Sequence, residues 1–138
     1  MRKRFDEKLY NRNDPAKLLA IDFFKSKNKT AVVNPDQYGI DLIVDEEFYC
    51  EVEVKHTWKG KTFTFPTLQI PERKDKFAVL DKPVMFMVFN SDKSYAFLVK
   101  GKDILDSPLV EISNKYVNRG EKFFQIPVDR LTKVKLGV

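Results

Sequence analysis

The sequence predicts a single α+β (α/β) domain over residues 1–138, in which one mixed central sheet is flanked by helices. The chain has 138 residues, the usual size of one domain with one core. Runs with helical and strand periodicity follow one another in the order helix, three strands, helix, two strands and mixed elements. Residues 84–89 read VMFMVF without polar alternation, which is typical of a central strand covered on both faces.

The first predicted helix begins at Asp14, which can cap it, and Pro15, which suits the first helical position. Apolar residues then recur near helical spacing as far as Phe24, and polar residues end the pattern at 26–28. Turn residues separate the strands that follow. These strands are expected at residues 30–33, 40–44 and 48–55.

Residues 45–47 connect two apolar-rich runs, so 40–44 and 48–55 are expected to pair as an antiparallel hairpin. Pro71 is expected to open a second helix over 72–80. Residues 57–67 fit no single element. The remaining predicted elements are strands at 84–89 and 95–100, a short helix near 102–105, and late strands at 110–112 and 122–126.

Composition excludes several classes of protein. A single cysteine, Cys50, cannot form an internal disulfide and excludes a cysteine-built zinc site, and the lone His56 excludes a histidine-rich metal site. No apolar run is long enough to cross a membrane, and the charged N-terminus lacks a secretory signal, so a cytoplasmic location without a membrane partner is expected. The net charge of +5 permits a polyanionic partner without requiring one.

Alternate residues of a strand face opposite sides of its sheet, so Glu51, Glu53 and Lys55 share one face of the strand at 48–55. The other face is apolar and should contact the core. Asp41 is the one charged residue of the strand at 40–44, where a carboxylate is costly unless it is paired or bound to a cation. The hairpin brings Asp41 beside the charged row.

Neighbouring carboxylates on rigid strands form a hard-oxygen site suited to Mg²⁺ or Mn²⁺. A nearby lysine can orient or deprotonate an activated water, as metal-assisted phosphodiester hydrolysis requires. The alternative is that these charges are simply solvated on an amphipathic edge strand.

The segments GIDLIV at 39–44 and EVEVK at 51–55 resemble the core of the PD-(D/E)XK nuclease superfamily, whose hairpin carries an Asp on one strand and an E-x-K on the next. The helices expected before and after the hairpin also match this family's pattern. The resemblance implies a restriction-endonuclease-like fold and a Mg²⁺-dependent nuclease acting on DNA. The first helix contains no Glu, which many members use as a further ligand.

The resemblance also implies a role for each residue of the motif. Asp41 and Glu53 would bind the metal together with the main-chain carbonyl of Val54, and Lys55 would act on the attacking water. Glu51 shares the face but lies one pleat pair away, so its loss is expected to cost less activity than the loss of Glu53.

The stretch LQIPERK at 68–74 is similar to the segment that follows E-x-K in family members, where a polar or basic residue reaches the phosphate. Such side chains can hold a DNA backbone, although basic residues on a helix face are more often solvated. The DNA-binding residues predicted on this basis are Gln69, Arg73, Lys74 and Lys76.

Basic and aromatic residues interleave at 59–65, as they do on nucleic-acid surfaces, but a hairpin with one buried aromatic face explains Phe63 and Phe65 equally. Trp58 fits a stacking role less well than core packing. Three functions therefore remain open: a metal-dependent endonuclease or exonuclease, an inactive nucleic-acid- or protein-binding module on the same fold, and an unrelated interaction protein. A homodimer would let two sites cut two strands.

Overall fold

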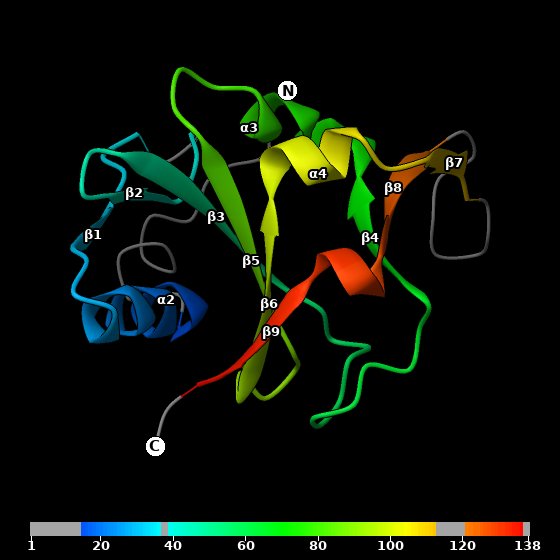
Figure 1. Cartoon of the computed structure of the whole chain (residues 1–138), viewed down its shortest axis with the longest axis horizontal. Coiled ribbons are helices and arrows are strands. Elements are labelled where there is room, and N and C mark those ends of the chain that lie inside the picture. Colours follow the sequence, from blue (N-terminus) through cyan, green and yellow to red (C-terminus); the bar gives the residue numbers. More distant parts are fainter. Residues whose placement is uncertain (1–14, 37–38, 113–120, 137–138) are drawn as a thin grey trace, which may run out of the picture.

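The structure is a computed structural model that describes residues 15–36, 39–112 and 121–136, and helix α2 (Pro15–Ser26) is the first element within these residues. A six-stranded mixed sheet with strand order β1-β2-β3-β5-β6-β9 forms the centre (Figure 1). Its strands are β1 (Ala31–Val33), β2 (Leu42–Val44), β3 (Phe48–Val54), β5 (Val84–Phe89), β6 (Tyr95–Lys100) and β9 (Thr132–Lys135).

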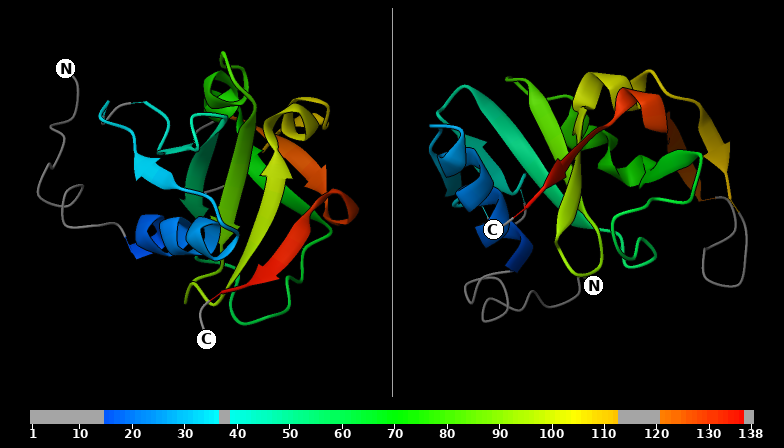
Figure 2. Two further views of the ribbon diagram at one scale, coloured as in Figure 1. Left: turned by 60° about the vertical axis from the view of Figure 1, so that its left-hand side comes forward. Right: turned by 60° about the horizontal axis from the view of Figure 1, so that its bottom comes forward.

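A second, antiparallel sheet with the order β4-β8-β7 packs on one face of the first. Helix α2 covers the other face, so α2 and the three-stranded sheet lie on opposite sides of the six-stranded sheet (Figure 1 and Figure 2). The remaining elements are β4 (Thr67–Pro71), η1 (Glu72–Lys74), α3 (Asp75–Ala78), α4 (Gly101–Leu105), β7 (Leu109–Glu111), β8 (Lys122–Pro127) and η2 (Val128–Arg130).

The predicted hairpin is confirmed, because β2 and β3 pair antiparallel with Leu42 opposite Cys50 and Val44 opposite Phe48. Its turn places Asp45 and Glu46 at φ values of 52° and 58°, in the left-handed region. The Asp45 carboxylate accepts a hydrogen bond of 2.7 Å from the backbone N–H of Thr30, which offsets part of the conformational cost.

Strand β5 is central, as its apolar sequence predicts. It pairs parallel with β3 and antiparallel with β6, and residues 86–89 are fully buried. Its side chains alternate between two cores, one shared with the three-stranded sheet and one shared with α2. The mixed α+β class is therefore confirmed.

Three expectations need correction. One face of the central sheet is covered by a second sheet rather than by helices alone, and the strands at Thr67–Pro71 and Thr132–Lys135 were not predicted. The helix expected over 72–80 is a 3₁₀ turn followed by the single turn Asp75–Ala78. Val79 and Leu80 are 66% and 39% exposed, so no apolar stripe remains there to stabilise so short a helix.

Candidate active site

Strand β3 presents two chemically different faces. Cys50 is fully buried in the core beneath α2, where Val52 and Val54 pack beside it. Glu51 and Glu53 alternate with these residues and therefore face the side of the three-stranded sheet. The separation of an apolar face from a charged face, predicted from the sequence, is confirmed.

Asp41 lies immediately before β2, where the hairpin ladder ends at the pair of Leu42 and Cys50. Its Oδ2 accepts a hydrogen bond of 2.8 Å from the backbone N–H of Val52, two residues beyond that pair. Its own N–H donates to Glu51 Oε1 at 3.3 Å. The Asp41 side chain thus hydrogen-bonds to β3, the strand that carries Glu51 and Glu53. This bond takes the place of another backbone hydrogen bond between the two strands of the hairpin.

Helix α2 supplies a cation to Asp41, since Lys17 Nζ lies 3.2 Å from Asp41 Oδ1. Lys17 is only 8% exposed. It lies on the buried side of the helix together with Ala16, Ala20 and Phe24. Lys17 was not among the site residues predicted from the sequence. A lysine inside a stripe of buried small residues is the signal that could have revealed it, because a buried ammonium requires a counter-charge.

Lys74 connects the two glutamates of β3. Its Nζ lies 2.9 Å from Glu51 Oε2 and 2.8 Å from Glu53 Oε1. The second contact is a close ion pair, so the buried Glu53 Oε1 has the Lys74 ammonium as its partner. Burial alone would lower the pKa of Lys74, but the charges of Glu51 and Glu53 outweigh it and raise that pKa.

Glu51 is the most deeply buried carboxylate of this cluster, with a side chain 4% exposed. Burial, followed by the charge of Asp41, raises its pKa to about 8, although Lys74 acts in the opposite direction. Glu51 contacts both Asp41 and Lys74, so it belongs to the same charged cluster as Glu53. A carboxylate with so high a pKa is poorly compensated, and an additional cation nearby would stabilise its charged form.

Lys55 continues the extended strand one residue beyond β3, since its N–H donates to the Phe89 carbonyl at 2.8 Å. Burial lowers the pKa of its ammonium, Glu53 opposes that change, and Arg73 reinforces it. A lysine with a lowered pKa releases its proton more readily than a solvated one. Glu53 and Lys55 therefore influence each other electrostatically, as the E-x-K spacing predicts.

The predicted DNA-binding residues occupy four different environments. Gln69 lines a cavity together with Lys55, whereas Lys74 points inward to the glutamates. The Arg73 side chain is 69% exposed and pairs with Glu121 at 3.2 Å. Lys76 is exposed and lies over the ring of Phe77 at 5.0 Å. Of the three predicted basic residues, Arg73 and Lys76 are exposed, whereas Lys74 is partly buried.

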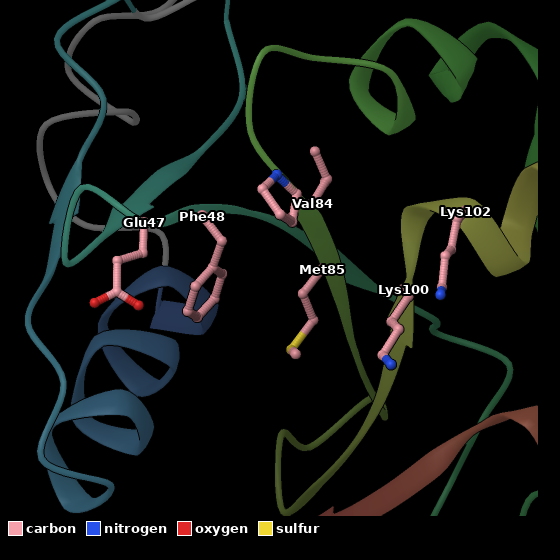
Figure 3. A pocket seen from close by; sticks show the side chains of 7 residues that line it. Glu47, Phe48, Val84, Met85, Lys100 and Lys102 are labelled. Carbon is pink, nitrogen blue, oxygen red and sulfur yellow. The ribbon is translucent and has the colours of Figure 1, made fainter.

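A larger cavity of about 630 Å³ lies on the opposite side of the central sheet from the carboxylates. Phe48 and Met85, which belong to the α2 side, form its apolar floor, and Lys100 lines it as well (Figure 3). Glu47 lies at the hairpin turn beside it. This cavity takes no part in the cluster around Asp41.

Comparison with known proteins adds no family: no protein-family model matches the chain, and no curated protein or solved structure is significantly similar to it. Within the residues that the structure describes, no three His, Cys, Asp or Glu side chains form a group placed to hold a metal ion. No helix in this part of the chain is long and apolar enough to cross a membrane. Assignment of a function therefore depends on the geometry of the site itself.

Proposed function

We propose that the chain is a Mg²⁺- or Mn²⁺-dependent nuclease that hydrolyses DNA phosphodiester bonds, with Asp41, Glu53 and Lys55 at its centre. The observation that carries the proposal is the hydrogen bond from the Val52 N–H to Asp41 Oδ2. This bond holds the Asp41 carboxylate, just before β2, against the backbone of β3, the strand that carries Glu53 and continues into Lys55. Such preorganised carboxylates with an adjacent lysine suit metal-assisted hydrolysis.

The donor atoms are of the chemical type that a hard divalent cation prefers, and this donor type rather than an existing three-carboxylate group supports the proposal. Asp41 and Glu53 would hold it with the main-chain carbonyl of Val54, a set of oxygen ligands of the kind that Mg²⁺ prefers. Glu53 Oε1 is buried and already paired with the Lys74 ammonium at 2.8 Å, so a metal at this atom would compete with that ammonium. The ammonium of Lys74, within 2.9 Å of both glutamates, shows that positive charge is already required at this position. When bound, the metal would supply Lewis-acid polarisation and an acidified water.

The remaining residues would position and steer the reacting groups. Lys55, whose pKa is lowered by burial, would orient the attacking water or accept its proton. Arg73 and Lys76 would contact backbone phosphates from the exposed segment that follows β4. Cleavage of both strands by a homodimer is a further expectation of the proposal.

A catalytically inactive binding module on the same fold is the second candidate, and one observation favours it. Lys17 and Lys74 already form ion pairs of 2.8–3.2 Å with Asp41, Glu51 and Glu53. Such a network can exist for structural reasons alone, without metal binding or chemistry.

Calorimetric titration of Mn²⁺ into the wild type and the Glu53→Gln, Asp41→Asn and Lys55→Ala variants distinguishes the two candidates. The nuclease proposal predicts that the wild type and Lys55→Ala bind the metal, because lysine is not a ligand, and that the two carboxylate variants bind it at least about tenfold more weakly. DNA binding by a wild type that neither takes up Mn²⁺ nor cuts DNA would favour the inactive module.

A further inference from the structure

A cavity of about 330 Å³ adjoins the proposed active centre on the side of the three-stranded sheet. Lys55 contributes to its wall, and Phe63 and Phe65 come from the connection between β3 and β4. Gln69 of β4 and Gln125 of β8 complete its polar part. Its volume is at the lower limit for small-molecule pockets, which suits one flat ring system rather than a larger ligand.

The aromatic wall is held rigidly at its base. Trp58 is 1% exposed and stacks on Phe97 with ring centroids 4.4 Å apart, which confirms core packing for this tryptophan. Phe63 packs edge-on against both, at 5.6 Å and 5.2 Å. Phe65 lies 5.4 Å from Phe63 but remains 48% exposed, so it offers a ring face that no part of the described chain covers fully.

The polar wall is a pair of amides at fixed positions. Gln69 and Gln125 are directly opposite each other in the antiparallel register of β4 and β8. Leu68 and Ile70 beside them are buried in the core, which fixes the strand that carries Gln69. Each glutamine amide offers both donors and an acceptor, the combination that pairs with the edge of a nucleobase.

We propose that this cavity binds one unstacked nucleobase of the DNA strand at the active centre, with Phe65 stacking on the ring and Gln69 and Gln125 meeting its polar edge. The inference rests on the proposed nuclease function, because Lys55 belongs to both the cavity and the catalytic row. A phosphate at Lys55 places the adjoining nucleotide at the mouth of the cavity. The cavity would therefore give the enzyme a preference for single-stranded or locally opened DNA, and Gln69 a role at a base rather than at a phosphate.

The test uses fluorescence anisotropy in EDTA, where no cleavage occurs. The probes are a labelled single strand that is abasic throughout and the same strand carrying one adenine at its centre. The wild type should bind the adenine-bearing strand about tenfold more tightly than the abasic one. Phe65→Ala should lose this difference, whereas Phe65→Trp should retain it. The control Leu109→Ala, which removes an apolar residue 40% exposed on β7 of the same small sheet, should retain it as well.

Equal affinity of the wild type for the two strands, or no measurable binding of either, would overturn the base pocket. A difference that survives in Phe65→Ala would also overturn it as drawn. Circular dichroism of each variant checks the fold, and Phe65→Leu, which keeps apolar bulk without a π face, serves if Phe65→Ala unfolds. If the wild type prefers the adenine-bearing strand but neither binds Mn²⁺ nor cuts DNA, the nuclease proposal fails and the base pocket stands. Failure of the pocket and failure of the nuclease proposal are therefore distinguishable.

Discussion

Asp41 Oδ2 accepts a hydrogen bond of 2.8 Å from the backbone N–H of Val52, so a side chain continues the hairpin where its backbone ladder ends. The same carboxylate is held by Lys17 through Oδ1. Asp41 therefore has a structural role in addition to the proposed metal-binding role. This dual role changes what its substitution is expected to do.

Asp41→Ala should destabilise the fold by about 1–3 kcal/mol, because it removes the carboxylate that accepts from the Val52 N–H and pairs with the Lys17 ammonium. Asp41→Asn is the matched variant, since it keeps an acceptor oxygen for Val52 and loses only the charge. Urea unfolding of both in EDTA measures the difference, and a wild-type midpoint for Asp41→Ala would contradict the structural role.

The stability of the metal-free protein should fall as pH rises from about 4.5 to about 8 because of Glu51. Its pKa is raised in the folded state, so over this range the folded protein holds a proton that the unfolded chain has released, and rising pH favours unfolding. Urea midpoints across this range should decline for the wild type and decline less for Glu51→Gln. The exposed Glu111→Gln is the control and should follow the wild type. Superimposable wild-type and Glu51→Gln curves would refute this assignment.

Lys74→Ala should destabilise the protein in EDTA, because Glu51 and Glu53 lose the ammonium that lies within 2.9 Å of both. Mn²⁺ should then raise the melting temperature of the variant more than that of the wild type, since the metal no longer competes with a tethered cation. Lys76→Ala, on the same short segment but exposed, is the matched control. Thermal unfolding of the three proteins with and without Mn²⁺ tests this; identical Mn²⁺ shifts would argue against competition at this position.

Arg73→Ala should weaken DNA binding and reduce by about one the slope of log affinity against log salt, because one phosphate contact releases about one counterion. Its loss should change stability by less than about 1 kcal/mol, since its pair with Glu121 is exposed on the arginine side. Lys133→Ala on the far edge strand β9 should leave the slope unchanged. Binding curves at two salt concentrations decide, and parallel slopes for wild type and Arg73→Ala would assign Arg73 to the solvated surface.

The sequence predicted the hairpin, the central strand and the two faces of β3 because each depends on local periodicity and on an obvious turn. It did not predict that Glu51 contacts Asp41, because that contact depends on strand register, which local periodicity does not specify. The roles of Lys17 and Lys74 depend on how elements far apart in the chain pack together. The strands β4 and β9 were missed for a similar reason, since both are short and are stabilised by pairing with distant segments.

The most direct test of the central claim is nicking of supercoiled plasmid in Mg²⁺ by the wild type and by Glu53→Gln, purified identically. Glu53→Gln preserves the size of the side chain and removes the charge that would hold the metal. We expect the wild type to nick the plasmid in Mg²⁺ and to stop nicking in EDTA. The nicking rate of Glu53→Gln should be lower than that of the wild type by at least about a hundredfold. Full nicking by Glu53→Gln, or none by a folded wild type that binds DNA, would contradict it.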